Sequence, residues 1–271
     1  MYPIQESDAD YFASGAYGST VAKAALISPQ KARDVIDGRF RHNTSALNFG
    51  TLWDTYTTGD RSSVIMRPDT YEDAKTGAIK EWHHSSTVCK AWHAEHANHI
   101  IAKKEDFERA VVMWERMPAK LRSLVEACQK QAVYRHTVGD IFAQCKVDLL
   151  RHDVLSSEMI DIKTTSSPIE EFDRQAMKYG YHVQAGWYRW IVKAATGESL
   201  PFSFIVTETV SPFRTVHFRP DDNWLAYADI EAARALAILS HPAATGDWSD
   251  KKPITQTLTL PHYISKGLSN A

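Results

Sequence analysis

The chain of 271 residues is 44% hydrophobic and 24% charged, values that are ordinary for a globular protein. No apolar run approaches the roughly 18 residues that span a bilayer, and the acidic, polar first residues are unlike a secretory signal. A net charge of −2 neither supports nor excludes nucleic-acid binding, because only the groove that holds a nucleic acid must be positive.

The three cysteines, Cys89, Cys128 and Cys145, form no CxxC pair. This odd, sparse set argues against a disulfide framework and a structural zinc site, and it favours a reducing compartment. We therefore expect a cytoplasmic protein with no membrane association. The length suits one continuous domain, in which a helical N-terminal part, residues 1–130, packs on a core formed by residues 131–271.

The first part is predicted to be mostly helical. Apolar residues recur at helical spacing over 19–38, where Pro29 interrupts the pattern. Two amphipathic helices are expected over 103–117 and 119–131, and Pro118 separates them.

A further helix is expected from near Gly50, and the segment after it is rich in histidine. Residues 80–100 hold five histidines, of which His93, His96 and His99 recur every three residues. This spacing resembles a metal site only weakly, and no HExxH motif is present, so a solvated helix is the favoured interpretation.

From about residue 131 the pattern changes to strands. Strands are predicted over 131–136, 141–150, 158–165, 201–210 and 213–220, and helices over 167–180, 181–198 and 221–241. A turn at Gly139–Asp140 joins the first two strands. The order predicts an α/β fold in which a mixed sheet is flanked by helices.

The strand 158–165 carries Asp161 and Lys163 among apolar residues. Side chains alternate along a strand, so these two project on one side, where burial costs several kcal/mol unless each charge is compensated. Asp148 ends the preceding strand, and a short loop can bring its carboxylate close to Asp161. Two such carboxylates repel each other unless a divalent cation such as Mg²⁺ lies between them.

Lys163 could then orient or deprotonate an attacking water, or offset phosphate charge. Taken alone, the D-x-K triplet is more often an ordinary ion pair. Gln184 and Tyr188 share a helix face at spacing i,i+4, which by itself is more often part of an amphipathic helix.

Together these residues resemble the PD-(D/E)xK nuclease superfamily and, within it, the RecB-like branch with its Q-x-x-x-Y motif. The segments "NFGTLWDTY", "CKVDLL", "MIDIKTT", "EEFDRQAMKYGYHVQAGWY" and "FIVTET" follow in the order seen in the phage and prophage exonuclease VIII (RecE-type) family. The similarity covers most of residues 45–210 and is most specific over 148–188. It implies a restriction-endonuclease-like core with an N-terminal helical region.

The resemblance implies a Mg²⁺-dependent exonuclease, with Mn²⁺ as a substitute, that degrades linear double-stranded DNA from its 5′ ends. Asp148, Asp161 and the Ile162 carbonyl would be metal ligands, and Lys163 would assist the nucleophilic water. Gln184 and Tyr188 would complete the catalytic set by positioning the site or the DNA backbone. The resemblance also implies a homo-oligomer in a bacterial host cell that acts on DNA ends with a single-strand annealing protein.

Two candidate ligand positions depart from that family, and "CKVD" also lacks the Arg and Pro often found before its Asp. Asp54 stands where the family usually has His, and Gln131 stands where it has Glu, so both are candidate outer metal ligands, with Glu126 as a possible substitute for Gln131. Two alternatives therefore stay open: a RecB-like endonuclease on flaps or single strands, and a catalytically impaired DNA-binding or assembly protein. No cysteine follows Tyr188, which excludes the iron–sulfur cluster of some RecB-like enzymes.

The candidates for contacts with DNA phosphates are Arg33, Arg39, Arg41, Arg174 and Lys178. For the first three a solvated helix face is the simpler interpretation. The aromatic residues Trp53, Tyr56 and Trp92 could wedge apart a terminal base pair, although core or interface packing is the more common use of such side chains.

Overall fold

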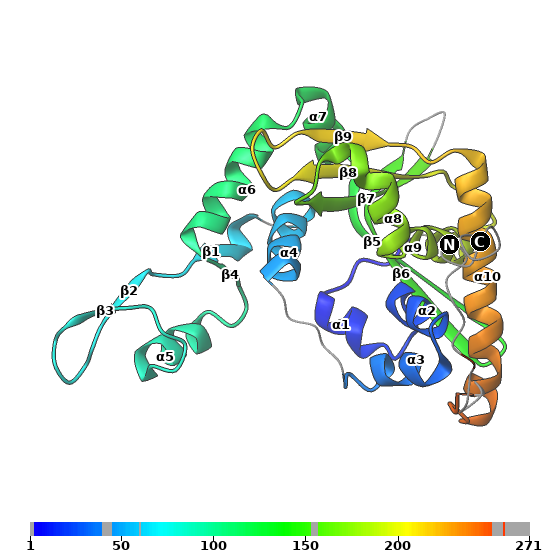
Figure 1. Ribbon diagram of the computed structural model, residues 1–271, viewed down its shortest axis with the longest axis horizontal. Coiled ribbons are helices and arrows are strands. Elements are labelled where there is room, and N and C mark those ends of the chain that lie inside the picture. Colours follow the sequence, from blue (N-terminus) through cyan, green and yellow to red (C-terminus); the bar gives the residue numbers. More distant parts are fainter. Residues whose placement is uncertain (1–2, 40–44, 60, 153–156, 251–256, 258–271) are drawn as a thin grey trace, which may run out of the picture.

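The centre of the fold is a five-stranded sheet in the order β5-β6-β7-β8-β9 (Figure 1). The computed structural model describes residues 3–39, 45–59, 61–152, 157–250 and 257. The strands are β5 (Gln129–Val138), β6 (Ile141–His152), β7 (Ser157–Thr165), β8 (Phe202–Glu208) and β9 (Thr215–Phe218). Neighbours run antiparallel except β7 and β8, which are parallel. The predicted mixed sheet is therefore confirmed.

The β5–β6 hairpin turns where the sequence predicts. Gly139 has φ +53°, a left-handed conformation that glycine adopts without strain. Between β7 and β8 the chain crosses through the 3₁₀ turn η2 (Ile169–Glu171) and the helices α8 (Phe172–Lys178) and α9 (Tyr181–Thr196). A parallel pair needs a connection of this length, so this crossover accounts for the change of strand direction.

One face of the sheet is covered by α9 together with helices from both ends of the chain. These are α2 (Ser19–Ala25), α3 (Pro29–Ile36) and α10 (Asp222–Thr245), and α1 (Asp8–Ala13) precedes them. Gly186 of α9 allows the close crossing with α10, because a Cβ at Gly186 would lie 2.0 Å from the Ala228 carbonyl oxygen. Trp187 is fully buried beside it in the apolar cluster of this face.

The opposite face is covered by α4 (Ser45–Thr58), α6 (Lys104–Arg116) and α7 (Ala119–Ala127). Ile160 and Ile162 of β7 pack on this face, whereas Met159 packs on the face of α9. Trp53 lies in this second cluster with only 1% of its surface exposed, stacked on Tyr56. Burial removes Trp53 from contact with a DNA end, so the wedge interpretation is wrong for this residue.

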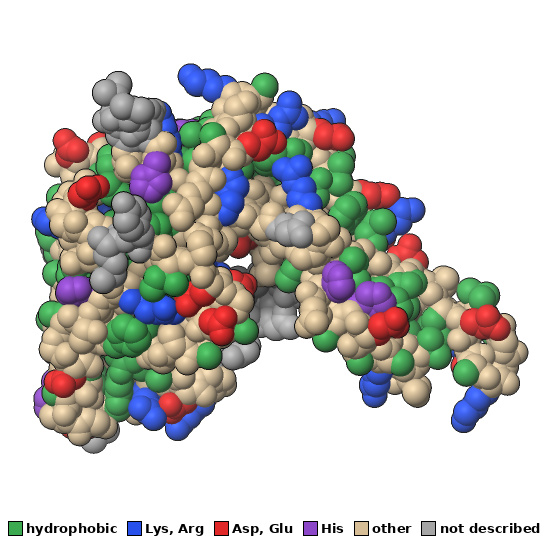
Figure 2. Space-filling model, turned by 180° about the vertical axis from the view of Figure 1, so that it is seen from behind, with side chains coloured by type: hydrophobic (Ala, Val, Ile, Leu, Met, Phe, Trp, Pro, Cys, Tyr) green, Lys and Arg blue, Asp and Glu red, His purple; other side chains and the backbone are tan. Residues whose placement is uncertain are grey.

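Residues 64–102 form an arm that projects from the body (Figure 1). It contains β1 (Val64–Met66) after the 3₁₀ turn η1 (Arg61–Ser63), the hairpin of β2 (Thr70–Glu72) and β3 (Ile79–Glu81), α5 (Thr87–Glu95) and β4 (Ile100–Ala102). Figure 2 shows the arm on the right of the body, with histidine and hydrophobic side chains side by side on it.

The arm corrects the prediction of one helix over the histidine-rich segment, because α5 ends at Glu95 and His96 and His99 follow it. His96 stacks on Trp92 with ring centroids 4.1 Å apart, so Trp92 packs within the arm. In the part of the chain that the structure describes, no helix is long and apolar enough to cross a bilayer.

Candidate active site

Asp148 and Asp161 meet where β6 and β7 separate. The ladder between these strands ends at the pair Leu149–Ile160, and Asp148 and Asp161 are the next residues on each side. The Asp148 carboxylate replaces the next ladder bond, since the backbone N–H of Ile162 donates to its Oδ2 at 2.8 Å. The end of strand pairing therefore places two carboxylates at one point of the sheet.

Asp161 is held on both of its oxygens. Its side chain is 1% exposed, Gln184 Nε2 donates to Oδ1 at 2.6 Å, and Lys163 forms an ion pair with Oδ2. Lys163 Nζ also lies 3.5 Å from the Ile162 carbonyl oxygen. The structure thus brings together five candidate residues from three elements: Asp148, Asp161, Ile162, Lys163 and Gln184.

Tyr188 lies one turn after Gln184 but in apolar surroundings. Its ring packs edge-on against Phe202, with centroids 6.1 Å apart. Burial raises the pKa of Tyr188 well above its usual value, and the negative charge of Asp148 adds to this. Its side chain is buried in the core, on the same helix as Gln184.

A second group of polar residues lies on the side of α4. Gln131 Nε2 donates to Thr58 Oγ1 at 2.7 Å and approaches Asp54 Oδ1 at 3.4 Å, and the Thr58 hydroxyl lies 3.1 Å from the same oxygen. Gln131 has φ +52°, a strained conformation for a non-glycine residue, and its buried Oε1 has no partner among the described residues. Thr58 was not singled out from the sequence, because a threonine in a helix carries no functional signal.

Glu126 is not part of either group. It is exposed in the last turn of α7, and no described contact joins it to Asp54, Asp148 or Asp161. The chain leaves α7 at Ala127 and enters β5 at Gln129, so the side chain of Gln131, rather than that of Glu126, reaches Asp54.

Negative charge exceeds positive charge in this cluster. Burial raises the pKa of Asp148 well above its usual value, and the nearby carboxylates of Asp161 and Asp54 raise it further. Burial also raises the pKa of Asp54. Burial alone would lower the pKa of Lys163, but Asp161 and Asp148 raise it above that of a free lysine. One protonated lysine, Lys163, therefore contacts the cluster directly, while Lys146 and Lys23 act on it from farther away.

The donor set fits a hard divalent cation that keeps part of its water. Among the described residues, no three His, Cys, Asp or Glu side chains converge closely enough to hold an ion by themselves. Two carboxylates and a backbone carbonyl are nevertheless the ligands that Mg²⁺ takes when water and phosphate oxygens fill its other positions. The repulsion between Asp148 and Asp161 is the observation that favours such an ion.

Two of the five predicted phosphate contacts are paired with aspartates of the chain itself. Arg33 pairs with Asp37 at 3.0 Å, and Arg39 pairs with both Asp37 and Asp34. Arg41 lies outside the described residues. Arg174 and Lys178 are exposed in α8, with Lys178 over the ring of Tyr179. The solvated-face interpretation therefore fits Arg33 and Arg39.

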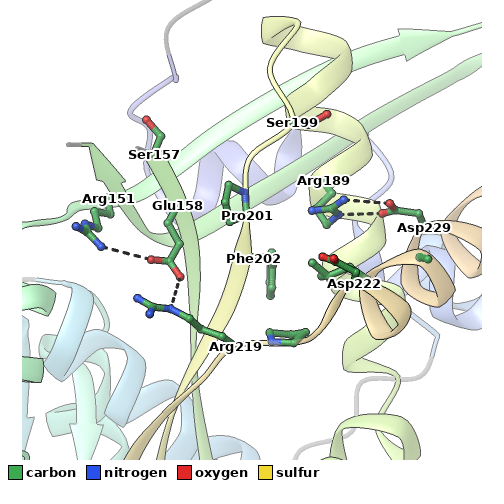
Figure 3. Close-up of a pocket in the computed structure, with 13 residues that line it drawn as sticks. Arg151, Ser157, Glu158, Arg189, Ser199, Pro201, Phe202, Arg219, Asp222 and Asp229 are labelled. Atoms are coloured by element: carbon green, nitrogen blue, oxygen red, sulfur yellow. Dashed lines mark hydrogen bonds and ion pairs between the residues drawn. The ribbon is translucent and has the colours of Figure 1, made fainter. Parts of the chain in front are cut away.

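A cavity of about 630 Å³ lies elsewhere, at the start of β7 (Figure 3). Its wall includes Glu158, which lies between Arg151 at 3.7 Å and Arg219 at 3.6 Å, and the pair of Arg189 with Asp229. Cations and carboxylates balance there, in contrast to the cluster around Asp161.

Comparisons with known proteins agree with this architecture. The family model described as a PDDEXK-like domain of unknown function (DUF3799) matches residues 18–251. A crystal structure from Eubacterium rectale, described as "Putative exonuclease", aligns with a TM-score of 0.60 and 15% sequence identity, covering 99% of this chain and 100% of that chain. At this identity the likeness shows a shared fold. No curated protein sequence matches the chain.

Proposed function

Because the chain belongs to the family of PDDEXK-like domains of unknown function (DUF3799), we propose that it is a metal-dependent deoxyribonuclease. More specifically, we propose an exonuclease of the RecE type that degrades linear double-stranded DNA from its 5′ ends. The observation that carries the proposal is the pair of buried carboxylates, Asp148 and Asp161, beside Lys163 where β6 and β7 separate.

Asp148, Asp161 and the Ile162 carbonyl would hold the cation, Mg²⁺ or Mn²⁺. When bound, this cation supplies charge stabilisation for the phosphate and lowers the pKa of water at the site. Gln184 keeps Asp161 Oδ1 in place through its 2.6 Å hydrogen bond, so it is a positioning residue. Tyr188, in the core, positions Gln184 through the helix that they share.

Lys163 has two uses that its contacts allow. In the structure its ammonium is paired with Asp161, whose charge and that of Asp148 keep the lysine protonated at neutral pH. A protonated lysine can donate to a phosphate oxygen and offset the charge that grows in the transition state. It can also orient the attacking water by donating a hydrogen bond to the water oxygen.

The Asp54–Thr58–Gln131 group favours one second candidate, a DNA-binding or assembly protein with an impaired site. Gln131 offers an amide to Asp54, and this contact occupies a carboxylate that would otherwise be available as an outer ligand. The proposed partners follow from the nuclease proposal: DNA ends as substrate, a single-strand annealing protein, and further copies of this chain.

The test gives purified protein Mg²⁺ and four DNA substrates: linear duplex labelled at either end, covalently closed circles, flaps and single strands. We expect loss of nucleotides from the 5′ ends of linear duplex only, and no loss when EDTA is present. Cleavage of circles, flaps or single strands would support the endonuclease alternative. Binding of DNA without cleavage in any metal would overturn the nuclease proposal in favour of the impaired protein.

A further inference from the structure

We propose that Lys23, on α2, forms with Tyr181 and Lys163 a pocket for a second DNA phosphate, one that flanks the phosphate to be cleaved. The inference rests on the proposed function, which supplies the DNA. It assigns a binding role to the N-terminal helices, whose predicted phosphate contacts, Arg33 and Arg39, are neutralised by aspartates.

Two lysines from distant parts of the chain share one aromatic ring. Lys163 Nζ lies 5.0 Å from the centroid of the Tyr181 ring, and Lys23 Nζ lies 5.4 Å from the same centroid. The two ammonium groups can therefore be no farther apart than the sum of these distances. Since Lys163 contacts Asp161, Lys23 lies directly beside the catalytic cluster.

The stem of Lys23 is held in place by the start of α9. Gly180 precedes α9 with φ +66°, and a Cβ there would approach Lys23 Cδ to 3.3 Å and Cγ to 3.4 Å. A glycine at this position thus permits the left-handed backbone and leaves room for the lysine stem. Packing of α2 on α9 orients the ammonium towards the Tyr181 ring instead of into bulk water.

Lys23 has no anionic partner in the described part of the chain, although it is partly buried. Its ammonium makes no hydrogen bond or ion pair with the described residues, apart from its position over Tyr181. Burial lowers the pKa of Lys23 to about 8, the charge of Lys163 lowers it further, and Asp161 opposes both. A partly dehydrated ammonium without a counter-ion is costly, and a phosphate would supply that counter-ion.

The end of α9 beside Lys23 also favours an anion. No side chain caps its first turn, and the first backbone N–H groups of a helix have no partner within the helix. The N-terminus of a helix of this length carries partial positive charge and commonly receives phosphate. Lys23 of α2 and Lys163 of β7 thus meet at the N-terminal end of α9, and all three groups carry full or partial positive charge that suits a phosphate oxygen.

The test measures DNA affinity without metal, in EDTA, by fluorescence anisotropy over a series of salt concentrations. Lys23→Gln should weaken binding several-fold and reduce the slope of log Kd against log salt by about one, because one phosphate contact is lost. Lys23→Met, which keeps the stem against Gly180, should give the same change, and Lys23→Arg should restore the slope.

Lys193→Gln is the matched control, since Lys193 is exposed in the last turn of α9 at the far end from Lys23. It removes the same charge and should leave the slope at the wild-type value. Both neutral variants at Lys23 should melt at or above the wild-type temperature, because they remove a partly buried unpaired charge. A loss of affinity through misfolding would instead lower the melting temperature.

The source of the phosphate is resolved by comparing closed circles with linear DNA that has either a 5′-phosphate or a 5′-hydroxyl. A slope change on all three assigns an internal phosphate, and a change confined to the 5′-phosphorylated DNA assigns a terminal one. Wild-type slope and affinity in both neutral variants would overturn the inference. Because no metal is present, this outcome is independent of cleavage. A protein that binds DNA through Lys23 but never cleaves it would contradict only the proposed function.

Discussion

Two buried carboxylates lie on β7, and their surroundings differ. Glu158 is 7% exposed and lies within 3.7 Å of Arg151, Arg219 and His217. Burial opposes its ionisation, but hydrogen bonds from His217 and Ser203 and the charge of Arg219 lower the pKa of Glu158 to about 2. The chain itself supplies every cation that this carboxylate needs.

Asp161, three residues later, contacts one lysine, Lys163, whose charge also acts on Asp148 and Asp54, while Lys23 and Lys146 act on these carboxylates from farther away. Under the proposed function, the two carboxylates of β7 differ in use, because Glu158 would stabilise the fold and Asp161 would hold the cation. Where cations match carboxylates, the site stabilises the fold. Where carboxylates exceed cations, the fold carries a cost that a metal ion and its substrate can remove.

The largest effect expected is on cleavage by Asp161→Asn. Loss of this charge should lower the cleavage rate by at least about a hundredfold, since a principal electrostatic element of the site is removed. The matched variant at the other carboxylate, Glu158→Gln, should keep its cleavage rate per folded molecule. Full activity of Asp161→Asn, measured on linear duplex with Mg²⁺, would show that the two carboxylates do not differ in use.

The free energy of unfolding should depend on Glu158 more than on the carboxylates of the candidate active site. Glu158→Gln removes the anion that pairs with Arg219 and His217, and we expect a loss of about 1–3 kcal/mol in the free energy of unfolding. Asp148→Asn, measured in EDTA, should be as stable as the wild type or more so, because it removes repulsion from Asp161. Urea unfolding measures both, and a larger loss for Asp148→Asn would reverse the comparison.

Metal should stabilise only the site with excess carboxylates. At a hundredfold excess over its Kd, Mg²⁺ should stabilise the folded wild type by about 2.7 kcal/mol, and EDTA should remove this gain. Asp148→Asn should lose most of the increase in melting temperature, whereas Glu158→Gln should keep it. An equal increase in all three proteins would place the ion elsewhere.

The pH dependence of stability should report on Glu158. Its pKa in the folded protein is about 2, below the ordinary value of 4.5, so the unfolded chain binds more protons between these values. The stabilisation is complete above about pH 4.5 and is lost as the pH falls towards 2. Glu158→Gln should flatten this part of the wild-type stability curve, and an unchanged acid limb would contradict the assignment.

The smallest effect is expected at the outer group. Gln131→Glu adds a carboxylate beside Asp54 and removes the amide that donates to Thr58. We expect the Mg²⁺ concentration for half-maximal cleavage to fall several-fold and the stability in EDTA to decrease slightly. An unchanged metal requirement would exclude Gln131 and Asp54 from the metal site.

Most of the fold could be predicted from short-range patterns in the sequence. Strand-like runs between turn signals predicted all five strands of the sheet, although β8 is buried along its whole length and shows no alternation, and helical spacing predicted α6, α7, α9 and α10. The three-residue strands of the arm, β1 to β4, are too short to show a period, and the histidines there suggested a longer helix than α5. The arm was therefore missed for a physical reason.

What the sequence by itself determined is the local part of the site. The spacing of Asp161 and Lys163 puts both side chains on one side of a strand, and the short connection after Asp148 allows the two carboxylates and the lysine to meet. Only the tertiary structure decided what surrounds them. Gln184, Asp54 and Lys23 reach the cluster because helices distant in sequence pack on the two faces of the sheet. Such contacts depend on how whole elements pack together, and spacing along the chain does not encode them.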